Sequence, residues 1–144
     1  MKKILIILLI GFVFTAVYAQ KDNPLKQGMP NTITLPNAEV VYDLNGEWNS
    51  FVESYGPWSH YGTHRNIIKI TQTGSSLVGI LMMNDVYYSK GWEYIRGELE
   101  KSGFKKVEFI TNLGILDSKG QISDDVNKII IDDGEKRRMT LTRK

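Results

Sequence analysis

The sequence predicts an all-β protein: an antiparallel meander of about eight strands that forms a closed or nearly closed barrel. Two observations carry this prediction. Short runs rich in β-branched and aromatic residues alternate with turn clusters at a spacing of roughly 8–12 residues. No window longer than about ten residues has apolar side chains at the spacing of an amphipathic helix. Short connections make neighbouring strands in sequence neighbours in the sheet, and a β-sandwich is the main alternative.

The first 19 residues have the layout of a secretory signal peptide. Lys2 and Lys3 precede an apolar run from Ile4 to Val17, and small residues at Val17 and Ala19 suit cleavage before Gln20. The run is shorter than the ~20 residues that span a bilayer. We therefore expect export to the periplasm or the exterior, with no membrane span after cleavage.

The remaining residues are expected to form one domain behind a polar leader. Residues 20–42 contain Pro24, Pro30 and Pro36, show no helical period, and predict a linker, which places the barrel at 43–144. Removing residues 1–19 leaves 16 basic and 16 acidic side chains, so charge gives no reason to expect nucleic-acid binding. The chain has no cysteine, and its stability must come from its hydrophobic core.

Turn signals separate the runs that predict strands. Asp133-Gly134 is the strongest hairpin signal of the chain. Lys119-Gly120 weakens the run in which it lies. The eight runs are Leu44–Val52, Asn66–Gln72, Ser76–Met83, Trp92–Glu100, Phe104–Thr111, Ile115–Ile122, Asn127–Asp132 and Arg137–Arg143.

Two short motifs stand in the first and the last predicted strands. The first strand contains Gly46-Glu47-Trp48, and the last ends in Arg143 on the same face as Met139 and Leu141. In these features the chain resembles lipocalin-like (calycin-type) β-barrel proteins. The resemblance implies that Trp48 plugs one end of the barrel while Arg143 packs across its ring, a favourable cation–π contact. It also implies that the barrel binds a small hydrophobic or amphipathic molecule.

Aromatic residues gather in the connection from Phe51 to His64 and in a second cluster beyond it. We expect them to line the mouth of the barrel, because loops at a barrel mouth carry binding residues. The structural alternative for the connection is folding back as a small satellite core, and for the second cluster it is cross-strand aromatic pairing. In a second functional hypothesis the loop 51–64 anchors an extracellular protein partner, as in an enzyme inhibitor. The residues expected to bind ligand are Tyr55, Trp58, Tyr61, His64, Trp92 and Tyr94.

The sequence shows no catalytic constellation. The paired aspartates Asp124-Asp125 and Asp132-Asp133 lie in turn-like sequence. Pro57 and Gly62 disfavour a helical register of His60 and His64, so no metal site is expected. Lys136-Arg137-Arg138 suggests the solvated start of a strand. We therefore expect a binding protein without enzyme activity, cofactor or metal.

Overall fold

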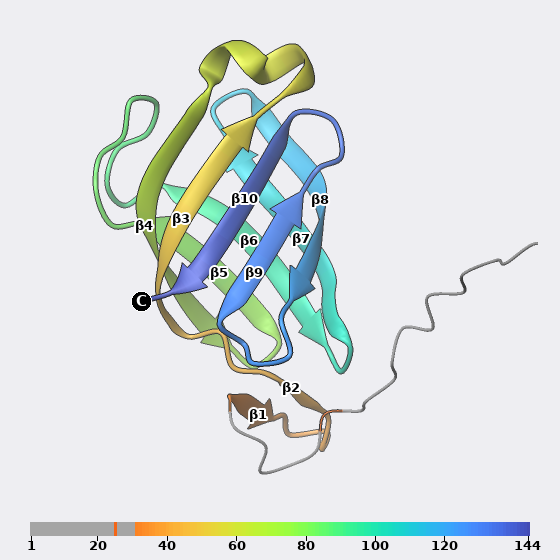
Figure 1. The fold of residues 1–144 in the computed structure, drawn as a ribbon. Coiled ribbons are helices and arrows are strands. Elements are labelled where there is room, and N and C mark those ends of the chain that lie inside the picture. Colours follow the sequence, from red (N-terminus) through yellow and green to blue (C-terminus); the bar gives the residue numbers. More distant parts are fainter. Residues whose placement is uncertain (1–24, 26–30) are drawn as a thin grey trace, which may run out of the picture.

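Eight antiparallel strands close into a barrel in the computed structural model, which describes Leu25 and residues 31–144 (Figure 1). Each strand pairs with the next in sequence, and the last pairs with the first, so that Arg137–Arg143 lies against Trp48–Ser54. This closure confirms the barrel and excludes the β-sandwich. The strands are β3 (Gly46–Ser54), β4 (Thr63–Thr73), β5 (Ser76–Leu81), β6 (Glu93–Glu100), β7 (Gly103–Thr111), β8 (Gly114–Ile122), β9 (Lys128–Asp132) and β10 (Arg137–Arg143).

The alternation of side chains along the strands fills the barrel. On β3 Trp48 and Val52 point inward, and on β10 Met139 and Leu141 do the same, as the sequence pattern predicts. Large side chains from every strand of the barrel except β8 fill its interior. Those that are fully buried include Trp48, Ile68, Ile70, Leu77, Leu81, Tyr94, Ile95, Phe109, Ile129, Ile131 and Met139.

One end of the barrel is plugged by Trp48 and Arg143, as the resemblance implies. The Trp48 indole is fully buried and donates a hydrogen bond to the Leu44 carbonyl at 3.0 Å. The Arg143 guanidinium lies 4.5 Å from the centroid of the Trp48 ring. Gly46 has φ +126°, and a Cβ there would lie 3.7 Å from Nη1 of Arg143, so the Gly-x-Trp motif needs its glycine for backbone conformation.

Part of the segment predicted to be a linker has regular structure. Strands β1 (Thr32–Thr34) and β2 (Val40–Tyr42) form a two-stranded hairpin beside the plugged end (Figure 1). Val41 is fully buried in the core. Gln72 ties this segment to the barrel, because its side chain accepts a hydrogen bond from the Leu44 amide and donates to the Tyr42 carbonyl. A three-residue strand gives too short an alternation to be predicted from sequence.

The predicted signal peptide and its cleavage site lie outside the described residues. In the described part of the chain, no helix combines the length and the apolar character needed to cross a membrane.

Candidate functional site

A short 3-10 helix, η1 (Gly56–Tyr61), covers the end of the barrel opposite the Trp48 plug (Figure 1). The strands β3 and β4 extend further than predicted, so the connection shrinks to eight residues, 55–62. Its ends are tied together by a hydrogen bond from the Ser54 amide to the Gly62 carbonyl, at 2.9 Å. Gly56 has φ +54°, and a Cβ there would lie 2.4 Å from the Glu135 carbonyl oxygen, so the helix start packs closely against the β9–β10 turn.

Aromatic and apolar side chains surround a small cavity beneath η1. The cavity has a volume of about 30 Å³. Its lining comes from η1, from the β5–β6 loop, from the β7–β8 turn and from the start of β10. We call this end the mouth; the residues that line its cavity are Trp58, Tyr61, Tyr87, Tyr88, Asn112, Leu113 and Arg137.

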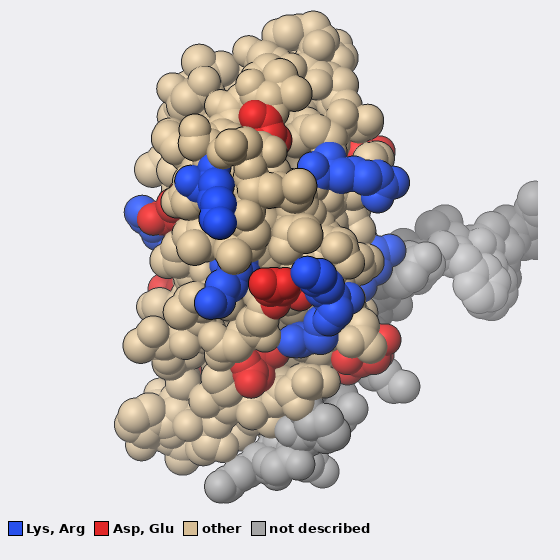
Figure 2. All heavy atoms as spheres, turned by 90° about the vertical axis from the view of Figure 1, so that its left-hand side faces the viewer, with Lys and Arg blue, Asp and Glu red and all other residues tan. Residues whose placement is uncertain are grey.

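The rings at the mouth contact one another edge to face. Tyr61 lies 5.8 Å from Trp58 and 5.2 Å from Tyr87 between ring centroids, and both pairs are nearly perpendicular. Such T-shaped pairs are the favoured geometry for aromatic side chains. In Figure 2 the tip of the molecule at this end shows none of the charged side chains that are scattered over the barrel wall. The mouth is therefore lined mainly by aromatic and apolar side chains, with Arg137 as its charged lining residue.

Arg137 is buried at the base of the mouth, which contradicts its prediction as part of a solvated strand start. It is 3% exposed, because it shares the inward face of β10 with Met139 and Leu141. Its guanidinium carbon lies 5.1 Å from the ring centroid of Trp58 and 5.6 Å from that of Tyr94. Its Nε and Nη1 atoms are buried without a hydrogen-bond partner, and the ion pairs of the described residues do not include it.

Two further buried polar atoms without partners lie on the strands beside Arg137. The Ser54 hydroxyl lies on β3 directly across from Arg137 in the strand register. Nδ1 of His64 belongs to the start of β4, the next strand along, while Nε2 of the same ring lies 3.3 Å from the Tyr94 hydroxyl. Burial lowers the pKa of His64, and Asp85 and Arg137 act on it in opposite directions. Neutral His64 carries one ring proton, which Nδ1 bears when the Tyr94 hydroxyl donates to Nε2.

Asp85 holds the β5–β6 loop in place at the mouth. One of its carboxylate oxygens accepts hydrogen bonds from the amides of Tyr87 and Tyr88, each at 2.7 Å. The other accepts a hydrogen bond from the Asn66 side chain at 3.3 Å. These contacts fix the backbone that presents two of the cavity-lining tyrosines.

The structure brings together some of the residues predicted to bind ligand and separates others. Trp58 and Tyr61 line the cavity, and His64 lies just below it. Tyr94 is fully buried beneath Tyr88, and burial raises its pKa. Trp92 is half-buried against the core, where its indole donates to the Ile110 carbonyl at 3.0 Å.

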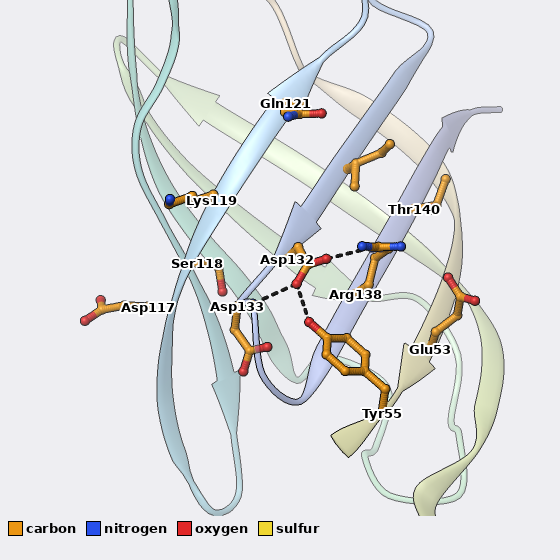
Figure 3. A pocket seen from close by; sticks show the side chains of 12 residues that line it. Glu53, Tyr55, Asp117, Ser118, Lys119, Gln121, Asp132, Asp133, Arg138 and Thr140 are labelled. Carbon is orange, nitrogen blue, oxygen red and sulfur yellow. Dashed lines mark hydrogen bonds and ion pairs between the residues drawn. The ribbon is translucent and has the colours of Figure 1, made fainter. Parts of the chain in front are cut away.

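Tyr55 lies away from the mouth, on the outer face of the barrel. It follows Ser54 on β3, and since side chains alternate along a strand, it points outward. It belongs to a second, larger hollow of about 890 Å³ on the outside of β3, β10, β9 and β8 (Figure 3). We call this the outer groove; it is lined by Glu53, Tyr55, Asp117, Ser118, Lys119, Gln121, Ile130, Asp132, Asp133, Gly134, Arg138 and Thr140.

Hydrogen bonds within the outer groove hold its central side chains. Asp132 accepts from the Tyr55 hydroxyl and from Nε of Arg138, the latter at 2.6 Å (Figure 3). Burial and the hydrogen bond to Asp132 raise the pKa of Tyr55 to about 12. Asp133 accepts from three backbone amides of the β9–β10 turn, those of residues 135, 136 and 137. No polar side-chain atom of the groove is buried without a partner, among the residues described.

The two hollows therefore differ in whether their buried polar side chains have hydrogen-bond partners. The groups of the outer groove stabilise the β9–β10 turn and one another. Those at the mouth are buried donors without partners, which native proteins rarely contain without a reason. The mouth is the better candidate for a binding site, although it is the smaller of the two.

His60 and His64 lie in different surroundings. His60 lies on η1 against the Tyr61 ring, 4.0 Å between centroids, and His64 faces the barrel interior. Within residues 31–144 no group of three or more histidine, aspartate or glutamate side chains lies close enough to hold a metal ion.

Fold and site together define the class of this protein as a closed, eight-stranded antiparallel β-barrel with one plugged end and one aromatic mouth, an arrangement compatible with a lipocalin-like fold. Comparisons with protein-family models, with curated proteins and with solved structures gave no match.

Proposed function

We propose that this chain is an exported, lipocalin-like binding protein that holds a small apolar or amphipathic molecule at its mouth. The observation that carries the proposal is the exposed apolar surface around the cavity. Leu113 is 65% exposed and Tyr87 40%, and both line the cavity directly. Large apolar side chains that are exposed together around a pocket are a common sign of a binding surface.

The size of the cavity determines how a ligand would sit. A volume of about 30 Å³ corresponds to roughly one or two water-sized groups, so the main part of a ligand does not fit beneath η1. It would lie across the rim, against Trp58, Tyr87 and Leu113. The barrel axis is filled by side chains such as Tyr94 and Phe109, and deep insertion would have to displace them.

A protein partner is the second candidate function, and the exposed apolar side chains next to the mouth favour it. Val86 is 84% exposed beside Tyr87, and Ile115 is 57% exposed two residues beyond Leu113. A partner could place an apolar anchor across this rim. Native mass spectrometry of gently purified protein separates the two functions, since a carried small molecule adds a few hundred daltons and a partner adds a second chain.

Replacing Trp58 by alanine is expected to weaken binding while leaving the fold intact. Trp58 is half-buried, and its ring makes an edge-to-face pair with Tyr61 and cation–π contacts with Arg137 and Lys136. Losing them should lower the free energy of unfolding by no more than about 1 kcal/mol. Affinity for octanoate, a simple amphipathic probe, should fall by about 2 kcal/mol, or roughly thirtyfold. Urea denaturation and fluorescence titration measure the two effects.

Trp92→Ala is the matched control for this change. Trp92 packs against the core and against the ring of Tyr88, and it hydrogen-bonds Ile110, so its loss should reduce stability by about 3 kcal/mol. A stability loss of that size for Trp58→Ala instead would identify η1 as a satellite core and argue against a ligand-binding mouth.

Export is tested by the mass of the protein recovered outside the cytoplasm. If Val17 and Ala19 direct cleavage, the exported protein should begin at Gln20. Intact-mass measurement of the periplasmic and medium fractions checks this. A soluble protein that retains residues 1–19 would argue against the proposed localisation.

A further inference from the structure

We propose that Arg137 is an anion-binding residue, and that the molecule held at the mouth carries a carboxylate which enters the cavity and pairs with the Arg137 guanidinium. This inference rests on the proposed function, since it specifies the ligand class of the same site. It is also more specific than the proposed function, because it requires the ligand to carry a negative charge, whereas a neutral apolar ligand could bind to the aromatic rim.

The Arg137 guanidinium is buried at a cost in free energy that its present contacts do not offset. An arginine side chain stays charged in proteins, so burial cannot be relieved by losing a proton. Arg137 is 3% exposed, and its Nε and Nη1 have no hydrogen-bond partner. A buried charge is ordinarily paired, because leaving it unpaired costs several kcal/mol. The contacts with the rings of Trp58 and Tyr94 recover only part of this cost.

Further polar atoms without hydrogen-bond partners lie on the strands next to Arg137. Ser54 lies across from Arg137 in the strand register, and His64 lies on the strand beyond. The Ser54 hydroxyl and Nδ1 of His64 are also buried without partners. Three neighbouring strands thus present unpaired polar atoms at one end of the barrel. The described carboxylates nearby are engaged elsewhere: both oxygens of Asp85 accept hydrogen bonds from Asn66 and from the β5–β6 loop.

The small cavity next to Arg137 is suited to a carboxylate. The cavity bounded by Arg137 has room for roughly one or two water-sized groups, which is enough for the small oxygen-bearing end of a carboxylate. A planar carboxylate can accept two parallel hydrogen bonds from a guanidinium, the strongest arrangement available to this pair. The remainder of the molecule would then emerge between Trp58 and Leu113 onto the apolar rim. The charged group would be buried and the apolar part would lie on the surface of the mouth.

The test compares three probes on the purified protein and two variants. Octanoate and 1-octanol have the same chain length and differ in charge. Acetate has a carboxylate but no apolar chain, so its binding tests the small cavity without the rim. Binding is followed by tryptophan fluorescence for the longer probes, and by NMR of the Arg137 Nε–H for acetate. The variants are Arg137→Met, which removes the charge inside the barrel, and Arg138→Met, which removes the next, outward-facing arginine that pairs with Asp132.

We expect octanoate to bind the wild type at least tenfold more tightly than 1-octanol. That preference should be lost in Arg137→Met and retained in Arg138→Met. Equal affinity for octanoate and 1-octanol in the wild type would overturn the assignment of Arg137 while leaving the proposed function in place. Acetate binding that depends on Arg137, without binding of either longer probe, would support the anion site and overturn the proposed function. No binding of any probe would overturn both.

Discussion

Replacing Trp48 by alanine is expected to lower the free energy of unfolding by about 3–5 kcal/mol, the range measured for large aromatic deletions in cores. The indole is fully buried and closes one end of the barrel, and its N–H donates to the Leu44 carbonyl. The change would open a cavity and leave that carbonyl without its partner. Since small domains are stable by only about 5–15 kcal/mol, a loss of this size would remove a large part of the protein's stability. Urea denaturation of the two proteins measures the difference.

Arg143→Lys is the informative companion to this change. Arg143 stacks on Trp48 and donates to three backbone carbonyls, those of Asp43, Asn45 and Val126. Lysine keeps the charge and loses the planar fork, so we expect an intermediate loss of about 1–3 kcal/mol. If Trp48→Ala lowered the free energy of unfolding by less than about 1 kcal/mol, the plugged end would not be a main source of stability. The resemblance to lipocalin-like barrels would then lose its main support.

The strand pattern of this chain could be predicted because period-two alternation is a local signal. Every predicted run overlaps one strand of the barrel, and the shared inward face of Trp48 and Val52 was evident from parity alone. The contact of Arg143 with Trp48 needed one further step, the closure of the last strand on the first. Strand ends were less predictable. Strand β3 continues to Ser54 and β4 begins at Thr63, and both of these ends are rich in polar residues that gave no sign of a strand.

The site was harder to predict than the fold because residue type and position gave opposite indications. Arg137 lies between Lys136 and Arg138, and a run of three basic residues ordinarily faces solvent. The alternation of side chains along the strand gives the opposite prediction, since Arg137 lies on the same inward face as Met139 and Leu141. The same reasoning would have placed Tyr55 outside the barrel, because Ser54 before it faces inward. Whether an inward arginine finds a partner there depends on neighbouring strands, which no single run of sequence reveals.

Arg137→Met is expected to stabilise the protein, by about 1–3 kcal/mol. Replacing buried charged groups by apolar residues of similar size is often stabilising, because desolvation of the charge costs more than its contacts return. Here the Nε and Nη1 atoms lack partners, while the contacts with the rings of Trp58, Tyr94 and Phe109 return about 0.5–2 kcal/mol. Methionine is unbranched and flexible enough to fill the same space. The urea midpoint should rise with an unchanged m-value.

Arg138→Met provides the comparison that isolates burial. Arg138 is its neighbour on β10 and is exposed, and its ion pair with Asp132 lies at the surface, so its loss should change stability by no more than about 1 kcal/mol. A stability loss above 1 kcal/mol for Arg137→Met would mean that the guanidinium holds the rings of the mouth together as a structural element. A gain in stability that accompanies loss of octanoate binding would mean the reverse: the barrel tolerates an unfavourable buried charge because a ligand completes it.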